Sequence, residues 1–200
     1  KDIFAIETGL SSDPATNWRL SKLDRVARIS NSDSHSLPRI GREANVFECE
    51  RSYRGIMSAI RSHDPKQFLF TVEFFPEEGK YHYDGHSAHH IRLAPSETKM
   101  LGGKCPTCGR QVTVGVLNRV EALADRPHGF RPERAIPFKR MVQLDEIIGE
   151  AFELGVSSKR VKSEYERIVA ALGSEFSVLM DRSPADIKAV AAPEVSEGIL

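Results

Sequence analysis

The segment HSAHHIRLAPSETKMLGGKCPTCG, residues 86–109, contains an H-x2-H pair and, after fifteen intervening residues, a C-x2-C pair. Structural zinc takes four nitrogen and thiolate ligands in a tetrahedron, and two close pairs supply that geometry with little loss of chain entropy. A module of roughly 40 residues has almost no hydrophobic core, so a metal would supply much of its folding free energy. We therefore predict a closed, structural Zn²⁺ site formed by His86, His89, Cys105 and Cys108.

The histidine pair is less specific than the cysteine pair. His82 and His90 are near enough in sequence to compete as ligands, and a reduced surface CxxC beside unrelated histidines is the alternative interpretation. The third cysteine, Cys49, stands alone, so a disulfide framework is excluded. A chain with one CxxC pair and no disulfide framework is typical of a reducing compartment, and we expect a cytoplasmic protein.

The composition of the whole chain is that of a soluble globular protein. Its 200 residues carry 28 basic and 28 acidic side chains, and 40% of them are hydrophobic, which excludes a wholly disordered chain and a collagen-like fibre. No run of about 18 apolar residues is present, so we expect no membrane partner. A net charge of zero also removes the simplest argument for nucleic-acid binding, a globally basic chain.

Upstream of the histidines, the sequence alternates between strand and helix signals. Apolar runs predict strands at 3–6 and 26–30, with a short helix at 18–23 between them. A helical pattern follows at 51–62, and we assign residues 1–65 to one α/β domain. The run at 1–6 has no lead-in and no Met, so we expect the chain to begin within a fold.

Asp33-Ser34-His35 follows the second of these strands. In α/β folds, functional side chains gather at strand ends, and alternate residues there point to the same face. A carboxylate and an imidazole so placed suit a catalytic metal, although the same residues commonly serve as caps and turns. Two ligands cannot complete a hydrolytic site, so others must come from elsewhere.

Downstream, strands are predicted at 68–75 and 111–117, and we assign residues 66–124 to the zinc module. Residues 125–200 are assigned to a linker and a helical region, with helices at 141–154 and 158–172. A strand is predicted at 176–180 and a last short helix from Ser183-Pro184. The tail after Val190 is expected to fray.

Charge is unevenly distributed along the chain. Between Arg92 and Arg140, ten basic residues face four acidic ones, a local net charge of +6. A basic zinc module and arm suit binding to a phosphate backbone, and the alternative is a solvated surface balanced by neighbouring residues. Arg39 and Arg42 follow the Asp-x-His pair and could hold a phosphate, although Arg42 could instead pair with Glu43 or Glu48.

Several long segments together resemble endonuclease Q, a DNA-repair nuclease family of the PHP (polymerase and histidinol phosphatase) superfamily. The resemblance covers roughly residues 1–180. The matching segments are ETGLSSDPATNWRLSKLDR, ISNSDSHS, IGREANVFE, TVEFFPEEGKYHYDGH, GGKCPTCGRQVTVGVLNRVEALADRP, PFKRMVQLDEIIGEA and SSKRVKSEYERIVAALGSEF.

The resemblance implies a fold: the C-terminal part of a PHP-type, barrel-like α/β domain, then a zinc-ribbon-like module and a helical region. It implies cleavage of DNA on the 5′ side of uracil, hypoxanthine or xanthine, or at abasic sites, by divalent ions (Zn²⁺, Mg²⁺ or Mn²⁺). Asp33 and His35 match the last metal motif of that domain. The substrate-side contacts implied are Glu7, Ser11, Asn17 and Trp18, and Arg42 joins them as a candidate because of its place after the Asp-x-His pair.

The chain departs from the family's pattern in two places. PHP sites also need an early His-x-His motif, which these 200 residues lack, so we expect the missing ligands on an N-terminal part of the same polypeptide. We therefore expect this chain alone to be inactive. The position of His89 is often a cysteine in the family, and a histidine can replace it as a zinc ligand.

Three functions compete at this point. The first is a phosphodiester hydrolase of deaminated DNA, acting at the nucleoid. The second is a zinc-ribbon module that binds nucleic acid without catalysis, which has no need of Asp33 and His35. The third is a PHP phosphoesterase acting on a small molecule, which leaves the basic segment unexplained. The sequence does not give the oligomeric state.

Overall fold

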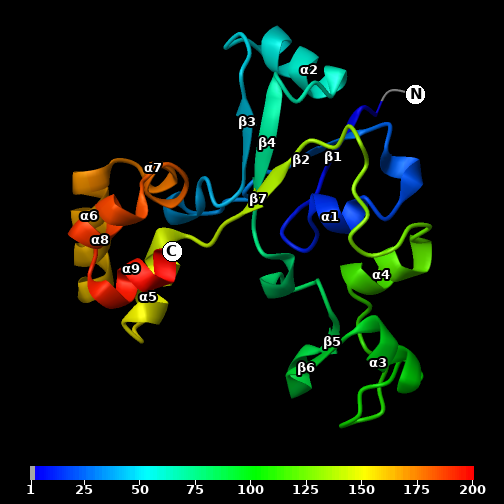
Figure 1. The fold of residues 1–200 in the computed structure, drawn as a ribbon. Coiled ribbons are helices and arrows are strands. Elements are labelled where there is room, and N and C mark those ends of the chain that lie inside the picture. The colour runs from blue at the N-terminus through cyan, green and yellow to red at the C-terminus, as the bar shows by residue number, and fades with distance from the viewer. Residues whose placement is uncertain (1–2) are drawn as a thin grey trace. The chain divides into compact units, whose positions relative to one another are not determined.

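The computed structural model describes residues 3–200 and divides into two compact units (Figure 1). One unit ends at Arg140, and the other comprises Met141–Leu200. Lys1 and Asp2, with which the strand-like run at 1–6 begins, lie outside the described residues. The domain boundaries predicted at residues 65 and 124 stay predictions.

Three small sheets form the framework of the first unit. Their strands are β1 (Ala5–Glu7), β2 (Ala27–Ile29), β3 (Ala44–Phe47), β4 (Phe68–Glu73), β5 (Asp84–His86), β6 (Ile91–Leu93) and β7 (Phe138–Arg140). β1 and β2 are parallel, β5 and β6 are antiparallel, and β4 lies between antiparallel β3 and parallel β7 (Figure 1). Together with the helices, they confirm the predicted mixed α/β class.

Helices connect these strands. The first unit contains α1 (Pro14–Asn17), α2 (Tyr53–Ser62), α3 (Pro95–Met100) and α4 (Val116–Leu123). It also contains the 3₁₀ turns Ser21–Leu23, Leu37–Arg39, Pro76–Glu78 and Ser87–His89. The helix predicted at 51–62 is confirmed as α2. Ser52 caps it by accepting a hydrogen bond from the Gly55 N–H at 3.0 Å.

Two buried hydroxyl groups tie the β1–β2 pair to the central strand β4. Ser30, just after β2, donates its hydroxyl to the Val72 carbonyl at 2.8 Å. Thr8, just after β1, donates to Oε2 of Glu73 at 2.9 Å. Because both bonds lie at the carboxyl ends of β1 and β2, they fix the edge from which the Asp33 loop leaves the sheet.

Two elements of the first unit differ from the predictions. The helix predicted at 18–23 is present only as the 3₁₀ turn Ser21–Leu23. The α-helix α1 lies before that range, because Asp13 is its N-cap and accepts from the Thr16 N–H at 2.8 Å. The strand predicted at 111–117 is wrong, since α4 begins at Val116. Buried Asp84 accepts from the Gly115 N–H at 2.6 Å and from the Asn118 amide at 2.5 Å, and this long-range contact fixes the helix start.

The second unit is entirely helical. It comprises α5 (Leu144–Ala151), α6 (Lys159–Leu172), α7 (Glu175–Met180), α8 (Pro184–Val190) and α9 (Pro193–Ile199). Their shared core consists of the buried residues Leu144, Ile148, Val161, Ile168, Leu172, Val178, Ile187, Ala191 and Val195. The helices predicted at 141–154 and 158–172 and the helix start at Ser183-Pro184 are confirmed.

Two predictions for this unit are wrong. Residues 176–180 form helix α7 instead of a strand, because a short apolar run fits either structure and the Ser174 cap decides for a helix. The tail after Val190 is also ordered as α9, whose Val195 is fully buried against the other helices. Apolar contacts across the unit therefore override the weak helical signal of the tail.

We expect Val195→Ala to lower the free energy of unfolding of the helical unit by about 2 kcal/mol, because it leaves a cavity in a packed core. Urea denaturation followed by far-ultraviolet circular dichroism measures this change. The matched control is Glu197→Ala on the exposed side of the same helix, for which we expect no more than about 0.5 kcal/mol. Equal midpoints for Val195→Ala and the unaltered chain would show that α9 does not support the core.

No helix within residues 3–200 has both the length and the apolar character needed to cross a membrane.

Candidate metal centres

The structure brings the predicted zinc ligands together. One ligand atom from each of His86, His89, Cys105 and Cys108 lies within 4.8 Å of the others. The Nδ1 atom of His86 is 3.1 Å from that of His89 and 3.4 Å from Sγ of Cys108, and the Nδ1 atom of His89 is 3.6 Å from Sγ of Cys105. Zinc bonds of about 2.0 Å to nitrogen and about 2.3 Å to sulfur place tetrahedral ligands roughly 3.3–3.8 Å apart. The four residues therefore fit a metal ion.

Two tight turns hold these ligands. His86 ends β5 and His89 lies in the 3₁₀ turn before β6, where His90 reverses the chain in the left-handed conformation with φ 52°. The cysteines lie in a knuckle closed by bonds from the Cys105 N–H to the Arg110 carbonyl at 2.7 Å and from the Gly109 N–H to the Cys105 carbonyl at 2.8 Å. The φ of +70° at Gly109 favours a glycine there.

The electrostatics of the cluster favour thiolate. Burial raises the pKa of the Cys105 thiol, but hydrogen bonds from His86 and from the backbone N–H groups of Cys108 and Thr107 outweigh it and bring the pKa to about 6. A thiol with this pKa is mostly ionised at neutral pH, which is the form that binds metal. The apolar core around the knuckle is small and comprises Leu93, Cys105 and Val112, with Ile91 packed against it.

His82 and His90 do not belong to this cluster. His82 is only 4% exposed, and its Nδ1 lies 2.9 Å from the Ser11 carbonyl oxygen. This contact connects the segment before β5 to the loop before α1. Gly79 makes the same approach possible, since a Cβ there would lie 2.4 Å from the Leu10 carbonyl oxygen.

Asp33 and His35 lie on an exposed loop after β2, at the carboxyl end of the β1–β2 pair. The ring Nδ1 of His35 is 2.9 Å from the Asp33 carbonyl oxygen. When Nδ1 donates this bond, Nε2 carries the lone pair and is free to bind a metal. Within residues 3–200, these two side chains are not joined by a third ligand in a metal-binding group.

Arg42 and Glu7 support this loop. Arg42 donates through Nε to the Ser32 carbonyl at 2.8 Å, so it positions the segment that bears Asp33. Glu7 accepts from the Asn31 amide at 3.2 Å and connects the ends of β1 and β2. The structure does not test a direct contact of Arg42 with substrate, which stays a prediction.

The other predicted substrate contacts have structural partners. Asn17 donates its amide to the Ser12 hydroxyl at 3.1 Å and to the Asp13 carbonyl at 2.8 Å. Trp18 is only 6% exposed and packs edge-on against Phe138, with ring centroids 5.5 Å apart. These contacts give Asn17 and Trp18 a structural role. The roles of Asn17, Trp18 and Ser11 in binding DNA stay predictions.

The basic segment between Arg92 and Arg140 is partly neutralised by residues nearer the N-terminus. Arg126 makes two bonds to the Asp24 carboxylate, at 2.8 and 2.5 Å, and Arg140 donates to buried Asp13. Other basic side chains of the segment remain exposed, among them Lys99, Lys104, Arg110 and Arg119. The exposed positive charge that could meet DNA therefore lies both around the His/Cys cluster and α4 and in the later part of the segment, at Arg131, Arg134 and Lys139.

The sequence did not predict two buried carboxylic acids behind the Asp33 loop. Glu43 is 3% exposed and accepts from the Phe74 N–H at 3.1 Å, while fully buried Glu73 accepts from Thr8 and Thr71. Burial raises the pKa of each to about 7. No local pattern marks these residues, because their burial arises from contacts between segments far apart in sequence.

The raised pKa of Glu43 predicts that the unit loses stability as the pH rises. An unfolded Glu titrates near pH ~4.3, so between about pH 4.3 and pH 7 only the native state holds the proton, and the free energy of unfolding falls with rising pH. Glu43→Gln removes this cost and should stabilise the unit by about 3 kcal/mol at pH 8 but by only about 1 kcal/mol at pH 5. Thermal melts at both pH values measure the difference.

The matched control for that experiment is Glu48→Gln, which changes an exposed carboxylate at the end of β3. We expect its melting temperature to match that of the unaltered chain at both pH values. The same stabilisation by Glu43→Gln at pH 5 and pH 8 would contradict a raised pKa.

The chain is similar in sequence to known proteins. Residues 143–200 match the family model of the MJ0043 C-terminal domain. Protein MJ0043 of Methanocaldococcus jannaschii is 31% identical over 205 residues, which cover 97% of this chain and 25% of that protein. Protein YqxK of Bacillus subtilis is 28% identical over 196 residues, covering 97% of this chain and 46% of the relative. The chain therefore spans less than half the length of either relative.

Two solved structures match the whole chain. The crystal structure of the lesion-specific endonuclease PfuEndoQ from Pyrococcus furiosus has a TM-score of 0.87 and 31% identity, covering 100% of this chain and 50% of that one. An endonuclease Q complex with a 27-mer duplex that carries an abasic lesion at the active site matches with the same TM-score, identity and coverage. The resemblance stated from the sequence is thereby confirmed: over its whole length this chain resembles one half of a chain of the endonuclease Q family.

Proposed function

We propose that the chain is part of a metal-dependent endonuclease of DNA repair that cuts on the 5′ side of deaminated bases (uracil, hypoxanthine or xanthine) or at abasic sites. The observation that carries this proposal is the match of the whole chain to lesion-specific endonuclease Q, at a TM-score of 0.87 and 31% identity. The proposed partner is DNA, and the proposed place of action is the nucleoid in the cytoplasm.

Asp33 and His35 are the residues that we propose to hold a catalytic divalent ion. They offer a carboxylate and an imidazole Nε2 on one exposed loop, which Arg42 braces through the Ser32 carbonyl. When bound, divalent ions activate water and stabilise the charge that develops on a phosphodiester. Because a hydrolytic site needs more than two protein ligands, we propose that this chain cuts DNA only together with ligands from another part of the same polypeptide.

A PHP-type barrel around β1 and β2 and a ribbon-like zinc module around β5 and β6 form part of the same proposal. In it, Zn²⁺ bound by His86, His89, Cys105 and Cys108 is structural, because four protein ligands leave no open position for substrate. The exposed basic residues of that region, such as Lys104 and Arg110, lie next to the ligands and suit contact with a phosphate backbone. Ser11, Asn17 and Trp18 remain proposed substrate-side residues.

A panel of labelled duplexes tests the proposal. The protein that contains this chain is incubated with Mn²⁺ or Mg²⁺ and duplexes that carry uracil, hypoxanthine, xanthine, an abasic site or no lesion. We expect a single break 5′ to the lesion and none in the undamaged duplex. Tight binding without a break at any lesion would favour the binding module, and hydrolysis of small phosphoesters alone would favour the phosphoesterase.

A further inference from the structure

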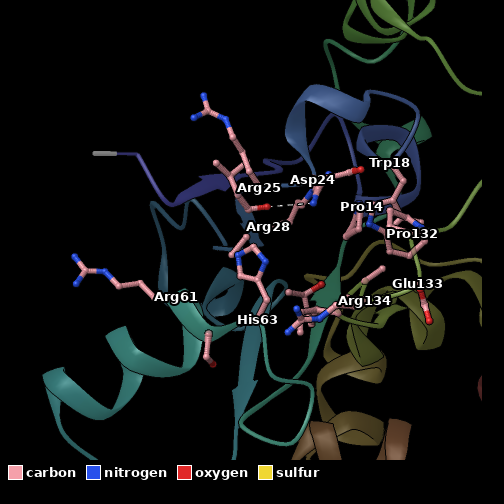
Figure 2. Close-up of a pocket in the computed structure, with 16 residues that line it drawn as sticks. Pro14, Trp18, Asp24, Arg25, Arg28, Arg61, His63, Pro132, Glu133 and Arg134 are labelled. Carbon is pink, nitrogen blue, oxygen red and sulfur yellow. Dashed lines mark hydrogen bonds between the residues drawn. The ribbon is translucent and has the colours of Figure 1, made fainter. Parts of the chain in front are cut away.

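A cavity of about 520 Å³ lies in the first unit, beside the segment that leads into β2 (Figure 2). Its volume is in the range of sites that bind small ligands. Its lining includes five basic residues beside several apolar ones: Arg25, Arg28, Arg61, His63 and Arg134. Asp33 and His35 do not line it, so it is separate from the proposed catalytic loop.

The acidic residues that line the cavity balance this charge only in part, since Asp24 attracts the Arg28 charge but is already bonded to Arg126. The Asp24 carboxylate makes a two-fold hydrogen bond with the Arg126 guanidinium, which lowers the pKa of Asp24 and keeps it ionised. The other acidic residue, Glu133, is exposed to solvent. The lining therefore carries an excess of positive charge.

Arg28 is the residue that most needs an anionic partner. Its Nη1 donates to the Val26 carbonyl at 3.1 Å, but its Nε and Nη2 atoms are buried without a hydrogen-bond partner. Burial lowers the pKa of Arg28, which reflects the cost of keeping the charge away from water. Buried charges in proteins are normally paired, so two unpaired donors on a residue that lines a cavity favour a ligand that accepts hydrogen bonds, toward which the Arg28 side chain would turn.

The side chains around Arg28 converge in the way that an anion site requires. Figure 2 shows Arg28, His63 and Arg134 facing the middle of the cavity, whereas Arg25 and Arg61 point away from it. Arg61 instead lies over the Phe4 ring, with 4.3 Å between its Cζ and the ring centroid. Burial, followed by the charges of Arg28 and Arg134, lowers the pKa of His63, so positive charges surround the same space.

We propose that this cavity binds a phosphate group through the guanidinium groups of Arg28 and Arg134, with His63 as a further hydrogen-bond donor. Guanidinium groups bind phosphate oxygens through paired, charge-assisted bonds. A phosphate offers more acceptor oxygens than a carboxylate, so two guanidinium groups and an imidazole can bind it together. The phosphate comes either from a DNA backbone, which rests on the proposed function, or from a free phosphate compound, which does not.

Two probes and three variants test this site. The probes are inorganic pyrophosphate, measured by isothermal titration calorimetry, and a fluorescent abasic duplex, measured by anisotropy at several salt concentrations. The variants are Arg28→Ala, Arg134→Ala and the matched control Arg25→Ala, which removes the same charge from a side chain that points away. Arg134 is exposed, so its substitution is expected to leave the fold intact, and thermal melts check all three variants.

We expect Arg28→Ala and Arg134→Ala to weaken binding of at least one probe by about tenfold, with less than about a twofold change for Arg25→Ala. If the phosphate belongs to DNA, each loss of a contact also lowers the slope of log affinity against log salt by about 0.9. If it is a free phosphate, only pyrophosphate binding falls. Binding of both probes that is unchanged in Arg28→Ala and Arg134→Ala would overturn the site. Pyrophosphate binding that depends on Arg28 would support the phosphate site even if the protein cuts no DNA, so the two proposals can fail separately.

Discussion

Replacing Cys105 with serine is expected to abolish zinc binding and to unfold the region that carries the β5–β6 hairpin and the knuckle. The Cys105 sulfur lies 3.6 Å from Nδ1 of His89 and is 1% exposed, so a neutral serine hydroxyl at this position leaves three ligands around the ion. Structural zinc contributes about 10–16 kcal/mol to the folding of small modules at pH 7. The local core is small, so contacts among Leu93, Val112 and Ile91 cannot offset that loss.

Metal analysis of the purified chain and hydrogen exchange across residues 80–116 measure this effect. We expect about one zinc per unaltered chain, almost none in Cys105→Ser, and fast exchange at the β5–β6 amides in the variant. The matched control is Cys49→Ser, since Cys49 is also a free cysteine and lies outside the cluster. Zinc content in Cys105→Ser equal to that of the control would remove the proposed site.

Replacing Asp33 with alanine is expected to lower the rate of DNA incision by at least about a thousandfold in the protein that contains this chain. Loss of the proposed carboxylate ligand would remove a charge that holds the catalytic ion, and a metal-assisted hydrolysis depends on such an ion for several kcal/mol of transition-state stabilisation. Asp33 is exposed, and because its φ of 45° is left-handed, its replacement by alanine should cost no more than about 1–2 kcal/mol of stability. Single-turnover kinetics on an abasic duplex with Mn²⁺ measure the rate.

Ser34→Ala is the control for that experiment, because it alters the same loop without removing a metal ligand. Its hydroxyl bonds only locally, to the Ser36 carbonyl at 2.5 Å, and we expect incision within about threefold of the unaltered rate. Duplex affinity in Asp33→Ala should also stay within about threefold, which separates a catalytic role from a role in binding DNA. A comparable loss in both variants would assign the effect to the loop's conformation instead.

Local chemistry explains which features could be predicted from the sequence. The zinc ligands are recognisable because each pair needs only a turn to converge, and the structure places one atom of each within 4.8 Å of the others. Helices α2 and α6 follow from an apolar face at helical spacing. The sequence also places Asp33 and His35 on the loop that follows a strand, as the structure has them, and their catalytic role stays a prediction.

The features that were missed depend on contacts between distant segments. Helix α4 starts where buried Asp84 accepts a hydrogen bond from the Gly115 N–H, 31 residues away. The strand-like residues before α4 therefore give no local signal of where the helix begins. Helix α9 is ordered because Val195 enters a core built by four other helices. The buried state of Glu43 and Glu73 and the unpaired donors of Arg28 likewise arise only after the strands assemble.

Incision of a duplex that carries one abasic site tests the central claim most directly. The protein that contains this chain is incubated with the end-labelled duplex and Mn²⁺, with and without EDTA, and the break is mapped to the nucleotide. The proposal predicts one break on the 5′ side of the lesion, lost with EDTA and lost in Asp33→Ala. An intact duplex under every metal condition, or a break unaffected by both EDTA and Asp33→Ala, would contradict it.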